Sequence, residues 1–208
     1  MWMIRDIHMG HSRSEKDASH ERILRIAAKR FREVGLAGLS VADLMEAAGL
    51  THGGFYRHFE SREALVAQAV AVALAEGQER VGVEPHPEAG VTLEGLLDAY
   101  LAEAHRDSPG EGCAVAALAA DAARSDAKTR AVFTRQVKRN LTSTSQLLRG
   151  NVGVTERSRA ILIWSALVGA LTLARAVNEK RLSAEILAAV RAELKALGAP
   201  RSRNSRKP

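Results

Sequence analysis

The segment GLTHGGFYRHF, residues 49–59, holds an unusual concentration of side chains that can bind another molecule. Thr51, His52, Tyr56 and His58 carry hydrogen-bonding groups, and aromatic side chains surround them. Two adjacent glycines in the same segment each cost a helix about 1 kcal/mol relative to alanine. Because they lack side chains, they also let the backbone approach a partner closely. These features favour a binding surface.

The spacing of these residues does not suit metal binding or catalysis. His52 and His58 are six positions apart, whereas a helix chelates a metal through residues four apart. Asp43 and Glu46 are most simply a helix cap and a solvent-exposed residue. No group of His, Cys, Asp or Glu in the sequence has catalytic or ligand spacing. We therefore expect no metal, no cofactor and no enzymatic activity.

The composition favours a helical protein of the reducing cytoplasm. Apolar residues make up 46% of the 208 residues and aromatic residues only 4%. Ala, Leu and Val dominate, which favours helix packing over a sheet. The single cysteine, Cys113, excludes an internal disulfide. The longest apolar run, residues 160–174, is too short for a membrane span, so we interpret it as a buried helix.

The charge is unevenly distributed along the chain. Of the net charge of +6, residues 1–62 contribute +2, residues 63–200 are neutral, and the tail at 201–208 contributes +4. This balance favours a polyanionic partner only weakly. The N-terminus lacks the apolar core of a secretory signal, and Met9 is an alternative start to Met1. We expect residues 1–16 and 201–208 to be flexible.

Helical periodicity runs through almost the whole sequence and predicts an all-α fold of about nine helices. The first helix is expected over about 18–34, and the second begins at Ser40, which forms a capping box with Asp43. A short third helix runs from Thr51 to residue 59, and Ser61 caps the fourth. Further helices are expected over 93–104, 113–124, 128–148, 155–177 and 183–197, with loops at 82–90 and 105–112.

Residues 40–59 match the pattern of a helix-turn-helix, in which a glycine turn joins two short helices. Gly49 permits the turn, and the second helix can then enter the major groove of DNA. Phe55 and Phe59 are placed to face the core. Helical hairpins are common, so this spacing supports DNA binding and a plain hairpin about equally. The domains follow as a three-helix unit at 17–62 and a larger bundle at 63–200.

The run from about residue 19 to residue 70 closely resembles the DNA-binding domain of the TetR (tetracycline-repressor-like) family of bacterial regulators. The matching stretches are ILRIAAKRFREVGLAGLSVADLMEAAGL, THGGFYRHF and ESREALV. The Tyr-x-His-Phe signature followed by Ser-Arg-Glu sets this family apart from other helix-turn-helix proteins. The resemblance implies a homodimeric regulator, more often a repressor than an activator. It also implies a palindromic double-stranded DNA operator and a small-molecule effector in the C-terminal bundle.

The resemblance also implies roles for individual residues. Ser40, Tyr56 and Arg62 would contact DNA phosphates, with Arg62 in the place of the family's usual lysine. His58 would lie beside the DNA backbone, and Thr51, His52 and Gly53 would face base edges. His52 and Gly53 are poorer base readers than Arg, Asn or Gln. Specificity would then depend on Thr51, His52, apolar contacts to thymine methyl groups and DNA shape.

The C-terminal half offers candidates for effector binding, although the sequence does not separate this role from core packing. They are Tyr100, His105, Cys113 and Trp164. Cys113 begins a helix after a glycine-rich loop, a position that can lower a thiol pKa. Some relatives in the family that sense electrophiles or oxidants carry a cysteine in a similar context. Inert packing is the alternative for Cys113.

The last two expected helices carry small and apolar residues at helical spacing, which predicts a dimer interface. The family's dimer normally uses these two helices, and packing inside one protomer is the alternative. The candidate interface residues are Leu162, Ala166, Gly169, Ala170, Ile186, Val190 and Leu194.

Two other functions remain open at this point. A helical enzyme or carrier could bind a small molecule in the bundle, with residues 40–59 a mere hairpin. An architectural DNA-binding protein without an effector is the third possibility. Strong salt dependence of DNA binding would favour a regulator over the first alternative. A bundle without a ligand-sized cavity would favour the architectural protein.

Overall fold

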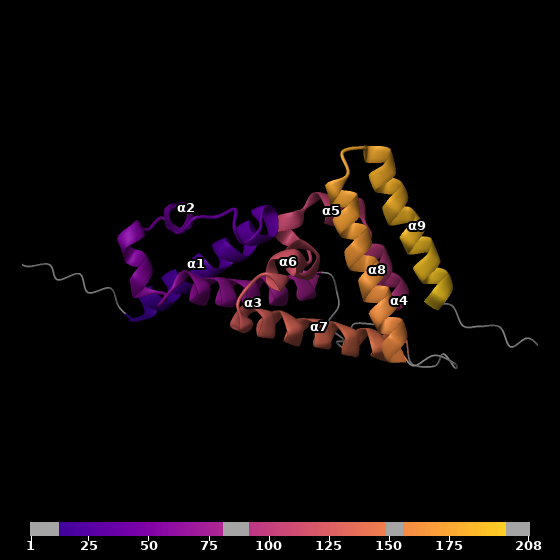
Figure 1. The fold of residues 1–208 in the computed structure, drawn as a ribbon, viewed down its shortest axis with the longest axis horizontal. Coiled ribbons are helices and arrows are strands. Elements are labelled where there is room, and N and C mark those ends of the chain that lie inside the picture. Colours follow the sequence, from indigo (N-terminus) through magenta and orange to yellow (C-terminus); the bar gives the residue numbers. More distant parts are fainter. Residues whose placement is uncertain (1–12, 81–91, 149–155, 199–208) are drawn as a thin grey trace, which may run out of the picture.

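The computed structural model describes residues 13–80, 92–148 and 156–198, and all regular structure in these ranges is helical (Figure 1). This confirms the predicted all-α fold class. The N-terminal part consists of α1 (Arg13–Val34), α2 (Val41–Ala47), the 3-10 helix η1 (His52–Arg57) and α3 (Arg62–Arg80). α3 packs along α1 and continues into contact with α7, so it joins the N-terminal part to the remainder of the chain.

The C-terminal part contains six more α-helices and a second 3-10 helix within the described residues. In Figure 1, α8 and α9 lie side by side at the end of the molecule opposite α2, and α6 lies between the two ends. The bounds are α4 (Leu93–Tyr100), α5 (Glu103–Asp107), η2 (Pro109–Glu111), α6 (Ala114–Ala123), α7 (Ala127–Leu147), α8 (Glu156–Ala176) and α9 (Lys180–Gly198).

A turn at Gly49 sets the angle between α2 and η1. Gly49 has φ +68°, which lies in the left-handed region that other residues rarely adopt. The Leu50 backbone N–H donates to the Met45 carbonyl at 2.8 Å, so the chain closes over the last turn of α2. Leu50 itself packs against the core. The predicted turn is therefore present, and it fixes how η1 leaves α2.

The predicted helix starts agree with the structure in several places. The Ser40 hydroxyl accepts from the Asp43 N–H, and the Ser61 hydroxyl accepts from the Ala64 N–H, both at 3.1 Å. Thr51 precedes η1 as expected but makes no side-chain capping hydrogen bond. Ile23 of α1 and Leu44 of α2 are buried in the core.

Three local expectations differ from the structure. α1 begins at Arg13 rather than near residue 18, and the third helix is a 3-10 helix. The helix expected over 93–104 breaks after Tyr100, and residues 105–107, expected as loop, belong to α5. The Tyr100 carbonyl accepts a hydrogen bond from His105 Nδ1 at 2.7 Å. This side-chain contact favours a break after Tyr100, although the helical periodicity continues in the sequence.

Parts of the expected termini and one expected loop lie outside the described residues. These are residues 1–12 and 201–208 of the termini and residues 82–90 of the loop.

The long apolar helix α8 occupies the centre of the C-terminal part. By length and composition alone it could cross a membrane, but 44% of its most apolar window is buried among other helices. Leu167 and Leu171 are fully buried, and α8 packs against both α7 and α9. This arrangement agrees with the expectation of a buried helix.

Candidate DNA-binding surface

Apolar side chains on the inner face of η1 pack into the core and hold this helix in place. Phe55 and Phe59 are 2% and 3% exposed, and their ring centroids lie 5.5 Å apart. Leu44 and Met45 of α2 are buried in the same core. The prediction that both phenylalanines face the core is therefore confirmed. A six-residue 3-10 helix with two glycines has little stability of its own, so this packing holds its outer face in position.

The outer face of η1 presents polar groups to solvent. Thr51, His52 and Gly53 are exposed, and Tyr56 is 74% exposed although its neighbour Phe55 is buried. A Cβ added at Gly53 would meet no atom within 4 Å. Nothing inside the described protein therefore requires a glycine there, whereas a closely approaching partner would. Thr51, His52, Gly53 and Tyr56 are therefore accessible to a partner, and their DNA contacts stay a prediction.

Ser40 lies at the N-terminus of α2 and shares its hydroxyl with Asp43. Besides accepting from the Asp43 N–H, the Ser40 hydroxyl donates to the Asp43 carboxylate at 2.6 Å. A hydroxyl has one proton, so it cannot donate to a phosphate while this bond remains. A phosphate at Ser40 would have to displace the carboxylate, and the two anions would repel each other.

Arg62 anchors the loop that precedes α2. One of its guanidinium nitrogens, Nη2, donates to the Leu36 carbonyl at 2.6 Å. Arg62 remains exposed at the start of α3, where the backbone N–H groups add partial positive charge. The phosphate contact of Arg62 stays a prediction. The bond to Leu36 is an additional structural role that the sequence pattern did not indicate.

His58 is half-buried behind the exposed face. Its Nδ1 is buried without a hydrogen-bond partner, and its ring centroid lies 6.2 Å from that of His20. Burial lowers the pKa of His58, and the nearby His20, Lys16 and Arg57 lower it further. His58 is therefore neutral near pH 7, and it adds no positive charge for a phosphate.

Two residues near this surface were missed by the sequence reasoning. Arg57 is exposed on η1 next to Tyr56 and offers a cation where the prediction had assigned none. His20 of α1 stacks on Phe59 with centroids 4.6 Å apart and hydrogen bonds to Gln68 of α3. Arg57 was visible in the sequence as a charge within the motif. No signal in the sequence pointed to His20.

The four effector candidates lie together in the C-terminal part. Tyr100 is fully buried, and its ring meets those of His105 and Trp164 edge-on at 4.8 and 5.6 Å. His105 Nε2 accepts from the Cys113 backbone N–H at 2.9 Å. Trp164 donates to the Thr144 hydroxyl at 2.6 Å. The candidates form one continuous contact chain that runs through α4, α5, the residue before α6, and α8.

These candidates differ in their access to open space. Trp164 lines an apolar cavity of about 230 Å³ together with Val115, Leu141 and Val168. Cys113 is 6% exposed and precedes α6 without capping it. The Tyr100 hydroxyl is buried without a well-aligned partner, and burial together with the nearby Cys113 thiol raises its pKa.

The dimer candidates divide into two groups. Ala170 and Leu194 are 4% and 5% exposed, so they are core residues within one protomer. This differs from the prediction, because helical spacing does not distinguish two neighbouring faces of one helix. The other five are partly or fully exposed: Leu162, Ala166, Gly169, Ile186 and Val190.

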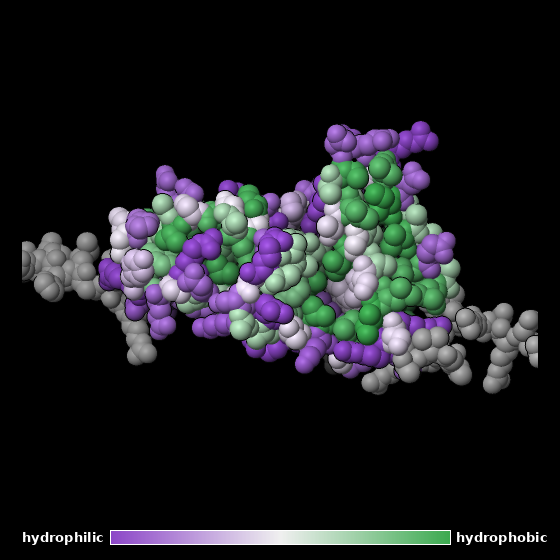
Figure 2. Space-filling view, viewed as in Figure 1, coloured by the Kyte–Doolittle hydropathy of each residue, from purple (hydrophilic) through white to green (hydrophobic). Residues whose placement is uncertain are grey.

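An apolar surface extends over α8 and α9 (Figure 2). Leu162 and Leu173 of α8 are 54% and 57% exposed, and Leu182 at the start of α9 is 39% exposed. A Cβ added at Gly169, between the two α8 leucines, would meet no atom within 4 Å. The surface could therefore admit another helix at close range.

Comparisons with known proteins agree with this geometry. Residues 23–69 match the model of the bacterial regulatory proteins of the tetR family. The HTH-type transcriptional repressor KstR2 of Rhodococcus jostii is 35% identical over 86 residues, which are 40% of this chain and 42% of that protein. The protein of the same name from Mycolicibacterium smegmatis is 32% identical over 57 residues, 27% of this chain and 28% of that protein. The matches thus span less than half of these curated relatives.

Solved structures extend the similarity across the fold. A TetR transcriptional regulator from Chloroflexus aurantiacus is 26% identical, with 88% of this chain and 95% of that chain covered and a TM-score of 0.73. The reduced form of Escherichia coli NemR is 19% identical, with 86% and 96% covered and a TM-score of 0.71. This second match supports the fold alone. With the helix-turn-helix geometry, the family match at residues 23–69 makes the N-terminal part of this chain similar to the bacterial regulatory proteins of the tetR family.

Proposed function

We propose that this protein is a cytoplasmic, homodimeric transcriptional regulator, a repressor that a small-molecule effector releases from a palindromic operator. The observation that carries the proposal is the outer face of η1. Thr51, His52, Gly53 and Tyr56 are exposed there, while Phe55 and Phe59 hold the helix from below. The curated relatives that match this region are named as HTH-type transcriptional repressors.

The proposed contacts divide into positioning and reading. Tyr56, Ser40 and Arg62 would bind phosphates and fix the position of η1, and Arg57 would add a cation beside them. Thr51, His52 and the backbone at Gly53 would face base edges in the major groove. Because few strong base readers are present, DNA shape would contribute to specificity.

The exposed apolar surface of α8 and α9 supports the homodimer. Leu162, Leu173 and Leu182 are exposed without a partner in the protomer, and open space surrounds Gly169. Replacing Leu173 by Asp should convert the dimer to a monomer in analytical ultracentrifugation, because dimerisation would then bury an unpaired charge in the α8–α9 interface. The same change at Leu182, which is less exposed, should weaken the dimer less. A monomeric wild type would contradict the homodimer.

The effector is proposed to bind within the C-terminal bundle and to favour a conformation whose two reading surfaces no longer fit the operator. This requires different effector affinities for the two conformations. The cavity beside Trp164 supports the proposal because it is mainly apolar and contains the polar side chains of Asn140 and Ser165. It also disfavours an architectural protein, whose bundle would need no such space.

The experiment that tests the function is selection of bound duplexes from random DNA by the purified protein, followed by gel-shift titration. We expect an enriched palindrome with half-sites about 10 base pairs apart, or a multiple of this spacing, because each η1 of a dimer enters one major groove. Enrichment of no sequence, or of sites without two-fold symmetry, would contradict the proposal.

The second candidate function is a helical enzyme or carrier that binds small molecules without binding DNA. The cavity beside Trp164 favours it, since this cavity would serve a carrier equally well. The two functions differ in salt dependence. For DNA binding, the logarithm of the affinity should fall with the logarithm of salt concentration, with a slope of about −0.9 for each neutralised phosphate. Binding of a small apolar molecule should depend little on salt.

The proposal that Cys113 senses electrophiles or oxidants stays a prediction. Its thiol lies near the Tyr100 hydroxyl in the contact chain of effector candidates, and it is almost fully buried. Replacing Cys113 by Ser should abolish electrophile-induced release from the operator in a gel-shift assay. Unchanged release from the Ser variant would remove the sensing role and leave Cys113 as a packing residue.

A further inference from the structure

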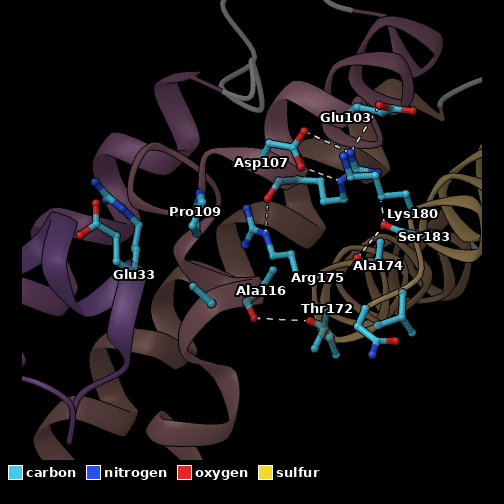
Figure 3. A pocket seen from close by; sticks show the side chains of 16 residues that line it. Glu33, Glu103, Asp107, Pro109, Ala116, Thr172, Ala174, Arg175, Lys180 and Ser183 are labelled. Atoms are coloured by element: carbon cyan, nitrogen blue, oxygen red, sulfur yellow. Dashed lines mark hydrogen bonds and ion pairs between the residues drawn. The ribbon is translucent and has the colours of Figure 1, made fainter.

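A second, larger cavity lies where the N-terminal part meets α8 and α9. It has a volume of about 960 Å³ and is lined by residues of α1, α5, α6, α8 and α9. Figure 3 shows Glu33 of α1 on one side, Lys180 and Ser183 of α9 on the opposite side, and Arg175 of α8 between them. This volume is within the range of small-molecule sites. None of the four effector candidates from the sequence lines it.

Two of the four cationic residues lining this cavity are already paired. Arg32 bonds to Glu76 at 2.8 Å, and Arg106 bonds to Asp107 at 2.7 Å and to Glu103 at 3.3 Å. Arg175 and Lys180 have no carboxylate within ion-pair distance among the described residues. Asp107 acts on both cations through longer-range electrostatics, so the charge of Arg175 and Lys180 is only partly compensated.

The guanidinium of Arg175 is held in a fixed orientation. Its Nε donates to the Arg106 carbonyl at 3.0 Å, and its Nη2 donates to the His105 carbonyl at 2.7 Å. A Cβ at Gly112 would lie only 2.9 Å from Nη2, so the glycine makes room for this arrangement. Burial lowers the pKa of Arg175, because desolvation disfavours the charged form. Neutral carbonyls orient the cation without neutralising it, and an anion would supply the missing charge.

The remaining charges limit what kind of anion fits. Glu33, Glu103 and Asp107 also line the cavity; Glu103 and Asp107 pair with Arg106, and Glu33 pairs with Arg30. They would repel a dianion such as phosphate more strongly than a singly charged carboxylate. Pro109, Ala116, Ala117 and Val177 supply an apolar wall. These features suit a carboxylate joined to an apolar body.

We propose that this cavity binds a small carboxylic acid, with its carboxylate on Arg175 and Lys180 and its apolar body against α6. Such a ligand would lie between α1, which belongs to the DNA-reading part, and the α8–α9 pair of the proposed dimer. Its regulatory meaning rests on the proposed function: the ligand would change operator affinity by altering how α1 meets α8. Binding itself does not depend on that function.

The experiment uses benzoate as the probe and the neutral benzamide as its matched control, each titrated by calorimetry into the full-length protein without DNA at constant ionic strength. Benzoate should bind, and benzamide should bind at least about tenfold more weakly, because charge-assisted bonds are the stronger ones. Equal binding of the two, or no binding of benzoate, would overturn the proposal. Binding of inorganic phosphate in preference to benzoate would overturn the choice of a carboxylate.

Variants locate the site. Lys180→Gln changes an exposed side chain and should fold normally, and it should weaken benzoate binding several-fold. Arg181→Gln is the matched control, because Arg181 is the exposed neighbour that does not line the cavity, and it should bind as wild type. Arg175→Gln should abolish binding, with circular dichroism as the check on folding. Wild-type affinity in Lys180→Gln would contradict the site.

Operator binding is measured separately in the presence and absence of benzoate. Benzoate binding without operator binding would contradict the proposed function and leave the site intact. Operator binding without benzoate binding would contradict the carboxylate site and leave the proposed function intact.

Discussion

The two surfaces proposed to bind other molecules are supported in different ways. The outer face of η1 is held by apolar contacts from below, and Tyr56 at its centre is 74% exposed. The cavity at Arg175 is held by buried polar contacts, in which guanidinium groups donate to backbone carbonyls. The first surface leaves its side chains free to adapt to a partner, and the second fixes its cation before any ligand arrives.

This difference suits the size of the proposed partners. DNA offers many phosphates, so an exposed surface can gain contacts without precise preorganisation. A small ligand offers few atoms, so affinity depends on groups already held in place. Phe55 and Arg32 give the clearest tests, because each supports one of the two surfaces.

The largest effect on stability is expected in the core that supports η1. Replacing Phe55 by Ala should lower the free energy of unfolding by about 3–5 kcal/mol, because it leaves a cavity in the core. Replacing the adjacent Tyr56 by Ala should change it by less than about 0.5 kcal/mol. Urea denaturation measures both. Similar losses from the two variants would contradict the division of η1 into a buried and an exposed face.

The next effect concerns the polar support of the cavity. Arg32 donates to the Gly110 carbonyl at 2.7 Å and to the Ala73 carbonyl at 3.0 Å, and it pairs with Glu76. Replacing Arg32 by Met should cost about 3 kcal/mol of stability, because these buried groups lose their partner. The control is Arg30→Met, which removes only a partly exposed pair with Glu33 and should cost less than about 1 kcal/mol.

A smaller effect is expected at the start of α2. Asp43→Asn removes a negative charge beside Ser40 and weakens the hydrogen bond that the Ser40 hydroxyl donates to residue 43. Operator affinity should increase several-fold, corresponding to about 1 kcal/mol, because a phosphate then meets less repulsion. Fluorescence anisotropy measures this change. Weaker operator binding by the Asn variant would show that Ser40 does not contact a phosphate in the way proposed.

The smallest effect concerns pH. The pKa of His58 is lowered in the folded protein, so folding favours its neutral form. The unfolded chain then binds more protons as the pH falls below 6.5, and stability decreases in that range. Urea denaturation near pH 8 and pH 5.5 measures this loss of stability. The loss should be smaller in the His58→Gln variant than in the wild type. An unchanged pH dependence would show that His58 does not contribute to it.

The N-terminal part could be predicted well because its signals are local in the sequence. Gly49, the capping residues and the alternation of buried Phe55 with exposed Tyr56 all act within a few positions. What escaped prediction was non-local. His20 stacks on Phe59 from a distant helix, and Arg62 reaches back to the Leu36 carbonyl.

The Arg175 cavity could not be predicted from the sequence for the same reason. Its residues come from five α-helices, and Arg175 appeared only as the charge ending an apolar run. The break after Tyr100 also depends on a tertiary contact, the bond from His105. Helical periodicity located α8 and α9 but did not separate the core residues Ala170 and Leu194 from the exposed Leu162.

The most direct test of the account is the affinity of Tyr56→Phe for the selected operator, measured by fluorescence anisotropy alongside its stability. The substitution removes only a hydroxyl from an exposed side chain, so folding should be unchanged. We predict operator binding at least about tenfold weaker, because a hydrogen bond to a charged phosphate is lost. Wild-type affinity in this variant would contradict the assignment of the outer face of η1 as the DNA-binding surface.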